Sequence, residues 1–250
     1  MVDDTDHSNV RLKHTFDRAP RAKLYPPMTV PTKEQILDAA EKLITERGID
    51  AVSLRAITAA ADVNLAAVHY HFGSKDALVH KVFERRIRPM NEERLRQLEA
   101  AEKAAGPGPL AVETVLRALI EPAMRVAAQH ERGPQLMMMC GRIYAERSMA
   151  AQDAFDDLFR EVVVRFREAF ARALPELPPE ELGWRVHFAA GVMVHTMMAS
   201  DKLQRFSGGL CDPRDTAAAV ERMIGFCAAG MRAGLPTAAG VEGSKIEVVQ

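Results

Sequence analysis

A run of small and aromatic polar side chains in the stretch Asn64–Lys75 has the residue types and spacing for a chemical task. Ala66 and Ala67 are small enough to let a helix approach base edges, and Tyr70 with its neighbouring histidines can reach phosphate oxygens. Few residues of the stretch have the apolar character of a core helix. The pattern therefore favours an exposed helix that contacts nucleic acid.

A preceding helix is needed to support this surface. Apolar residues recur at spacings of three and four from Ile36 to Ile44, which predicts a helix of about four turns. Thr32 is the expected N-cap, and Glu34 suits the positive end of the helix. Gly48 should end it, because glycine readily adopts the left-handed conformation that helix ends require.

Two shorter helices should follow. Ser53 is expected to cap the second, and the turn Asp62–Asn64 separates it from a third helix, Leu65–His71, that Gly73 stops. Two short helices joined by such a turn match the helix-turn-helix, whose second helix enters the major groove of DNA. The same spacing also fits a helical hairpin buried in a bundle.

The string VHYHFGSKDAL, Val68–Leu78, resembles the TetR family of transcriptional regulators, and the resemblance extends over Val30–Met90. Further segments that carry it are Ile36–Gly48, Val52–Ser53, Ile57 and Ala60–Val63. The resemblance implies that Tyr70 and Lys75 touch phosphates and that Phe72 locks the third helix to its domain. His69 departs from the commonest pattern of the family, which leaves one DNA contact open.

The candidate DNA-binding residues follow from the pattern and the resemblance together. They are Thr32, Lys33, Ser53, Arg55, Asn64, Leu65, Ala66, Ala67, His69, Tyr70, His71 and Lys75. If the resemblance holds, Tyr70→Ala should weaken all DNA sites similarly. Changes at Ala66 or Ala67 should instead alter which sequence is preferred.

Charge is unevenly distributed in the first third of the chain. Arg11–Lys33 holds six basic residues and one acid, whereas Glu34–Asp76 holds four basic residues and seven acids. The predicted DNA-binding domain is therefore locally acidic, and its phosphate contacts must come from a few placed side chains. Arg18, Arg21 and Lys23 in the basic leader could contact DNA beside it, or the leader could be a solvated segment.

The rest of the chain predicts an all-α protein of about nine helices. A long fourth helix begins after Ser74 and a fifth opens at Pro109. The sixth spans Gly133 to about Arg147, and the seventh spans Ala150–Leu174. An eighth follows Glu180, and Asp212-Pro213 is expected to cap the ninth. The predicted organisation is a flexible basic leader (1–29), a DNA-binding domain (30–90, its helix-turn-helix about 53–72), an effector-binding and dimerisation domain (91–234) and a flexible tail (235–250).

The eighth and ninth helices have more apolar surface than one core needs. In the eighth, Trp184, Phe188, Val192, His195 and Ala199 share one face, and a second apolar face holds Val186, Val194, Met197 and Met198. A second apolar face predicts burial against another subunit. The resemblance implies a homodimer through these two helices, and a two-fold dimer should bind a palindromic operator in double-stranded DNA.

The resemblance also implies a small-molecule effector that changes the separation of the two DNA-reading helices. The candidate effector residues are Met124, Met138, Arg142, Phe159, Val163, Phe166 and His195. Methionine and phenylalanine suit an adaptable apolar pocket, although such a stripe is also typical of plain core. The expected function is a ligand-responsive repressor that a small apolar effector releases from DNA, and repression rather than activation is taken from the habit of the family.

Other classes of protein fit the sequence less well. The sequence contains no GxSxG or HExxH motif and no glycine-rich phosphate loop. One group of carboxylates could be imagined as a catalytic cluster, but it lies largely opposite a phenylalanine stripe: Asp153, Asp156, Asp157 and Glu161. An enzyme is therefore not expected. An interaction module that kept the fold and lost DNA binding stays an alternative. Three scattered cysteines predict reduced thiols and no metal site, and no cofactor is expected. Because the sequence shows no signal peptide and no membrane span, the chain is expected in the cytoplasm.

Overall fold

A computed structural model describes residues 32–129, 149–198 and 200–235. The predicted basic leader, the sixth helix expected over Gly133–Arg147 and nearly all of the predicted tail lie outside the described residues. The expectations for Arg18, Arg21 and Lys23 lie outside them as well.

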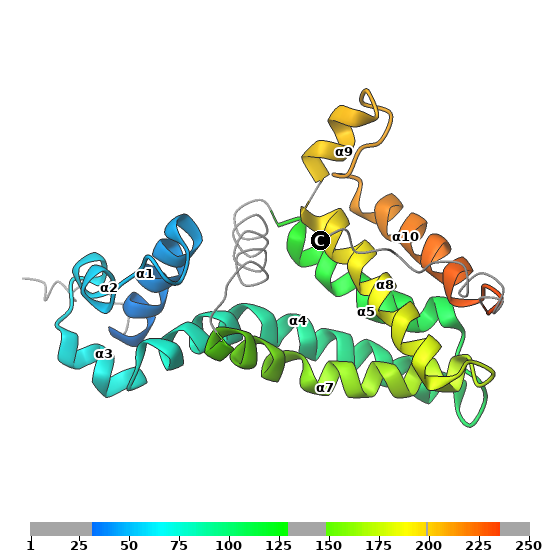
Figure 1. Cartoon of the computed structure of the whole chain (residues 1–250), viewed down its shortest axis with the longest axis horizontal. Helices are drawn as coiled ribbons and strands as arrows, with labels where there is room; N and C mark the ends of the chain where they lie inside the picture. Colours follow the sequence, from blue (N-terminus) through cyan, green and yellow to red (C-terminus); the bar gives the residue numbers. More distant parts are fainter. Residues whose placement is uncertain (1–31, 130–148, 199, 236–250) are drawn as a thin grey trace, which may run out of the picture. The chain divides into compact units, whose positions relative to one another are not determined.

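Within that part of the chain the regular secondary structure is helical throughout, which confirms the all-α prediction (Figure 1). The helices are α1 (Thr32–Arg47), α2 (Leu54–Ala61), α3 (Leu65–Phe72), α4 (Lys75–Ala105), α5 (Val112–Ala127), α7 (Met149–Ala173), α8 (Pro179–Met198), α9 (Ser200–Phe206) and α10 (Thr216–Met231). None of these described helices has the length and apolar composition needed to cross a membrane.

The first three helices begin and end close to where the sequence places them. The backbone amide of Ala56 donates to Ser53 Oγ (3.2 Å), and that of Ala67 donates to Asn64 Oδ1 (2.8 Å). Both predicted N-caps are therefore confirmed. Gly48 has a φ of 86° directly after α1, as expected of a helix end. Thr32 was expected to cap α1 but is instead its first residue.

Helix α4 is a single helix of 31 residues that continues through Pro89. Ser74 caps it, because its Oγ accepts from the amide of Ala77 (3.1 Å), and Gly106 with a φ of 59° ends it. The predicted domain boundary after residue 90 falls inside this helix. The division into two domains stays a prediction.

Several helix starts differ from the sequence prediction, among them that of α8, which begins at Pro179, and one helix was not expected. α5 begins after Ala111 and not at Pro109, because the backbone of Ala111 is still extended, with a ψ of 132°. α10 begins after Asp215, whose Oδ1 accepts from the amide of Ala218 (3.0 Å). Asp212, the predicted cap, is instead paired with Arg214, and the short helix α9 was not predicted.

A buried polar cluster joins the helices that pack against α4. The side chain of Arg94 is only 2% exposed and donates from Nε to the carbonyl of Leu119 on α5 (2.9 Å). Its Nη1 donates to Asn91 (3.0 Å), and Asn91 Nδ2 donates to the carbonyl of Leu158 on α7 (2.8 Å). α4 and α7 run side by side in Figure 1, and this cluster fixes their register.

The inward face of α8 differs from the one expected. Arg185 is buried because its Nη1 donates to the carbonyls of Met231 (2.7 Å) and Ala233 (2.8 Å) at the end of α10. Burial of Arg185 turns Trp184 and Phe188 outward, where they are 55% and 59% exposed. The second apolar face was expected against another subunit, but three of its residues pack against the core of the same chain: Val186, Val194 and Met197.

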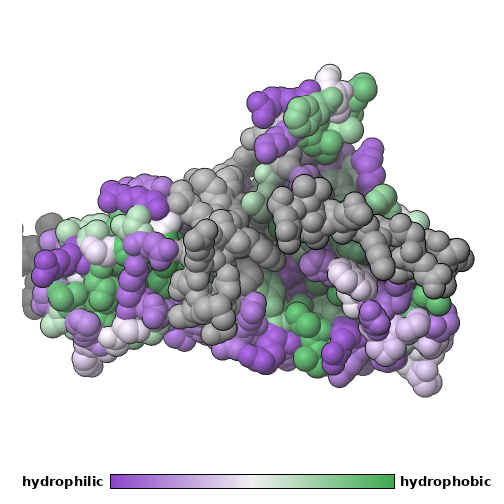
Figure 2. Space-filling view, in the orientation of Figure 1, coloured by the Kyte–Doolittle hydropathy of each residue, from purple (hydrophilic) through white to green (hydrophobic). Residues whose placement is uncertain are grey.

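Apolar side chains are also exposed around α9. Leu203 is 43% exposed, Phe206 86% and Leu210 91%. Figure 2 shows hydrophobic residues at the surface of this segment, among hydrophilic ones. The segment therefore contributes little to the core of its own chain.

Candidate nucleic-acid interface

The turn between α2 and α3 is set by the left-handed backbone of Asp62, with a φ of 53° and a ψ of 46°. Its amide donates to the carbonyl of Thr58, and the amide of Val63 donates to the same oxygen (3.0 Å). Aspartate tolerates this conformation better than most residues with a Cβ atom. The turn closes α2 and redirects the chain into α3.

Helix α3 presents two different faces. Val68 and Phe72 are buried, which agrees with the expected role of Phe72 in holding the helix. Ala66 and His69 are exposed, whereas Ala67 packs partly against the core. The outward face is thus built around a small residue and a histidine.

Tyr70 is the most exposed aromatic side chain of this helix, at 85%. Its ring meets that of His71 edge to face, with centroids 5.0 Å apart. His69 Nδ1 lies 3.0 Å from the carbonyl of Gly73, so this ring is held at the end of its own helix. An aromatic hydroxyl held far from the core is free to bind a partner group such as a phosphate.

The polar candidate residues around this face differ in their exposure and in their hydrogen bonds. Thr32, Lys33 and Arg55 are exposed, as is Leu65 at 41%. Lys75 donates from Nζ to the carbonyl of Ile49 (2.7 Å), which ties the start of α4 to the segment after α1. An ammonium has three donors, so this bond leaves two for phosphate.

Four of the seven acidic residues counted between Glu34 and Asp76 lie on α1, and arginines of α4 pair with three of them. Arg85 binds Glu34 (3.1 Å), Asp38 (2.8 Å) and Glu41 (2.5 Å). Arg86 also binds Glu41, from Nε at 2.7 Å. Three of the carboxylates that made the domain look acidic are therefore engaged by α4.

The electrostatics of this cluster agree with its geometry. Burial lowers the pKa of Arg85, but its hydrogen bonds to the carboxylates of Glu41 and Asp38 outweigh that effect and leave the pKa above its ordinary value. The Arg85 Nε atom is nonetheless buried without a hydrogen-bond partner among the described residues. Sequence reasoning missed the cluster, because its members lie more than forty residues apart.

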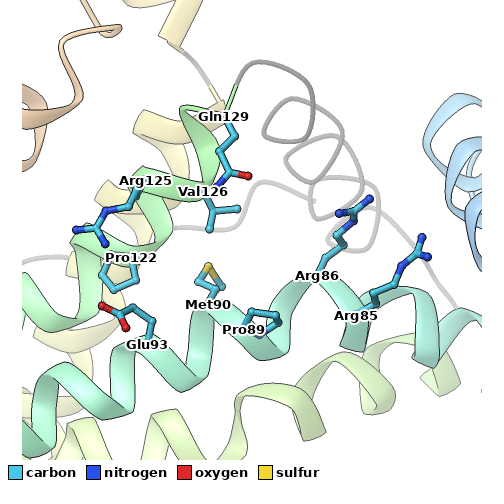
Figure 3. A pocket seen from close by; sticks show the side chains of 9 residues that line it. All are labelled: Arg85, Arg86, Pro89, Met90, Glu93, Pro122, Arg125, Val126 and Gln129. Atoms are coloured by element: carbon cyan, nitrogen blue, oxygen red, sulfur yellow. The ribbon is translucent and has the colours of Figure 1, made fainter.

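A crevice of about 280 Å³ lies between α4 and α5 (Figure 3). Its apolar floor is formed by Pro89 and Met90 on α4 and by Pro122 and Val126 on α5. Neither proline has an amide hydrogen, so each removes one backbone hydrogen bond from its helix.

None of the described members of the predicted effector set lines the crevice. Met124 and Phe166 are buried in the core and Phe159 packs partly against it, whereas Val163 and His195 are exposed. The remaining two, Met138 and Arg142, lie outside the described residues. The structure thus places the described members apart from the cavity, and their role in binding an effector stays a prediction.

Comparison with known proteins agrees with this geometry. A capped helix, a left-handed turn and a second helix with an exposed small and aromatic face define the class of helix-turn-helix regulators. Residues 36–82 match the model described as bacterial regulatory proteins of the tetR family, and residues 117–230 match the tetracyclin repressor-like C-terminal domain. The chain belongs to the TetR family of transcriptional regulators.

Individual relatives resemble parts of the chain. The transcriptional regulator AcrR of Shigella flexneri is 32% identical over 42% of this chain and 46% of its own length. The nicotine-responsive repressor HdnoR of Paenarthrobacter nicotinovorans is 27% identical over 42% of this chain and 54% of its own length. The chain thus spans about half the length of these curated relatives.

A solved structure extends the likeness in fold to most of the chain. The fatty acid degradation regulator FadR of Bacillus halodurans matches with a TM-score of 0.59 and 16% identity, covering 83% of this chain and 100% of its own. At 16% identity, this match shows a similar fold and nothing about function.

Proposed function

We propose that this chain is a ligand-responsive repressor that binds a palindromic operator as a homodimer and is released by a small-molecule effector. The observation that carries the proposal is the helix-turn-helix with its exposed Ala66, His69 and Tyr70 on α3. These side chains have the size and polarity for groove and phosphate contacts. The proposal is supported by membership of the TetR family.

Dimerisation is supported by the exposed apolar side chains of α8 and α10. Trp184 and Phe188 stack with their centroids 5.8 Å apart, and Phe226 on α10 is 70% exposed. Gly191 and Gly225 are exposed on the same two helices and have no atom within 4 Å of an added Cβ, so a second backbone has room to approach. Exposed apolar surface beside small residues is typical of a packed interface.

A two-fold dimer requires symmetry in its DNA. Two copies of α3 related by a two-fold axis read half-sites about one DNA turn apart, which makes the operator a palindrome or near-palindrome. An effector needs only to prefer one dimer geometry over another. A differential affinity of about 1–3 kcal/mol gives roughly a 5- to 150-fold change in DNA affinity.

The experiment is footprinting and mobility shift of the purified full-length protein on the intergenic DNA upstream of its own gene. We expect one protected palindromic site. Tyr70→Phe removes only the hydroxyl and should weaken all bound sites by a similar factor, whereas Ala66→Ser should change the preferred base. A folded dimer that protects no palindromic site contradicts the proposal.

A further inference from the structure

The crevice between α4 and α5 is lined by more hydrogen-bond donors than acceptors. Arg85 and Arg86 lie at one end of the apolar floor, and Arg125 lies at the other end beside Glu93 (Figure 3). Guanidinium groups only donate hydrogen bonds. A molecule that fits this lining must therefore bring acceptors.

Glu93 is the acidic side chain of the crevice lining, and it is already engaged. Its carboxylate accepts from Arg96 (2.7 Å) and from Gln97 (2.8 Å), and these hydrogen bonds lower its pKa to about 2. It therefore has little capacity left for a ligand donor. A cationic ligand would meet three guanidinium groups and no free counter-charge in this lining.

The two arginines at one end of the crevice have a second partner outside it. Arg85 and Arg86 together hold three carboxylates of α1, of which Glu41 is only 7% exposed and is shared by both. Two guanidinium groups are thus shared among three carboxylates. An additional anion at this end must compete with α1 for the same cations.

One donor of this pair is unsatisfied. Arg85 Nε is buried without a partner among the described residues, although the other nitrogens of that group are bonded to α1. A buried donor without an acceptor is costly, and an acceptor placed there recovers that cost. The Arg85–Arg86 end is therefore better suited to an acceptor than the Arg125 end, where the guanidinium is exposed and pairs with Glu121.

We propose that the crevice binds a small amphipathic carboxylate, with its apolar body on the Pro89–Val126 floor and its carboxylate at Arg85 and Arg86. This inference rests on the proposed regulatory function and names the effector class and the route of its action. The bound carboxylate competes with Glu41 for Arg86, which loosens α1 from α4 and lowers affinity for the operator. Because coupling between two ligands is reciprocal, operator DNA lowers carboxylate affinity by the same factor.

The test compares ligands that share one apolar body. Octanoate, 1-octanol and octylamine are titrated calorimetrically into the full-length protein at neutral pH, with 4-phenylbutyrate as a second carboxylate. We expect both carboxylates to bind, octanol to bind at least about tenfold more weakly, and octylamine not to bind, because a charged hydrogen bond contributes more than a neutral one. Equal binding of octanoate and octanol, or binding of neither carboxylate, overturns the proposal.

Four variants locate the carboxylate. Arg86→Gln should weaken octanoate binding about tenfold or more, and Glu41→Gln should strengthen it severalfold because a competitor is removed. Arg125→Gln, at the far end of the same crevice, and Arg88→Gln, on α4 outside the crevice, should change octanoate affinity less than threefold. Circular dichroism checks that each variant is folded, and unchanged octanoate affinity in Glu41→Gln contradicts the competition with α1.

Mobility shifts separate this inference from the proposed function. Octanoate should release operator DNA from the wild-type protein and less effectively from Arg86→Gln. Operator binding that octanoate leaves unchanged refutes the effector route while the DNA-binding function stands. If no operator is bound at all, the proposed function fails, and the calorimetric titrations still decide whether the crevice binds carboxylates.

Discussion

Replacing Phe188 by alanine should weaken the proposed homodimer without unfolding the subunit. Phe188 is 59% exposed on α8 and stacks on the equally exposed Trp184, so its ring contributes little to the core of its own chain. The variant therefore removes apolar area that the proposed dimer interface would bury. The stability of the single subunit should change by less than about 1 kcal/mol, as for most exposed positions.

The magnitude follows from the area that remains exposed. An aromatic side chain buries about 150–250 Å², so the 59% exposed fraction of Phe188 leaves roughly 90–150 Å² for a partner. At about 25 cal/mol per Å², and with the Cβ retained in alanine, the loss is about 2–3 kcal/mol for each copy. A symmetric interface contains two copies, so the dissociation constant should rise by roughly 10³- to 10⁴-fold.

The assay is sedimentation equilibrium over a dilution series, with thermal unfolding measured in parallel. Val163→Ala is the matched control, because Val163 is 61% exposed on α7 and lies on neither α8 nor α10. The reasoning is wrong if Phe188→Ala dimerises within threefold of the wild type. It is also wrong if Val163→Ala weakens the dimer to the same extent.

Three further predictions concern the turn, a buried arginine and a surface ion pair. Asp62→Val should lower the free energy of unfolding by about 1–2 kcal/mol in urea denaturation, because a β-branched residue disfavours the left-handed backbone, while Asp62→Gly should cost nothing. Arg185→Gln removes hydrogen bonds to the end of α10 and should lower unfolding stability by several kcal/mol, whereas the exposed Arg214→Gln should stay within about 0.5 kcal/mol. The hydrogen bond from Arg232 lowers the pKa of Glu113 to about 2, so its stabilising effect is present above the ordinary pKa of 4.5 and is lost as the pH falls towards 2. The difference in Tm between wild type and Arg232→Gln should therefore exist at pH 6 and disappear by about pH 2, and a pH-independent difference would exclude this pairing.

The helix-turn-helix could be predicted from the sequence because its signals are local. Ser53 and Asn64 each cap the helix that begins one residue later, and the capping atom and amide lie only three residues apart. Where two local signals compete, the sequence does not decide between them. Asp212 and Asp215 are both suitable caps, and pairing of Asp212 with Arg214 leaves the role to Asp215.

Features that depend on distant contacts could not be predicted in the same way. A tryptophan is ordinarily expected inside and an arginine outside, but Arg185 is buried by its bonds to α10 and turns Trp184 outward. The local charge count likewise missed that Glu41 is paired with Arg86 on another helix. The crevice depends on two prolines, Pro89 and Pro122, that the tertiary fold brings to one place.

Helix α4 continues through Pro89, which lies near its middle. Because proline removes one backbone hydrogen bond there, the helix bends most easily at this residue. From Pro89 to the start of the helix at Lys75 the arm is about 21 Å long, at 1.5 Å per residue. A bend of about 10° at the proline would move the far end by roughly 3–4 Å, close to the rise of one base pair. In the proposed regulator, a ligand beside Pro89 would need to cause only a small rotation there, because the length of the helix converts that rotation into a displacement of about one base pair on DNA.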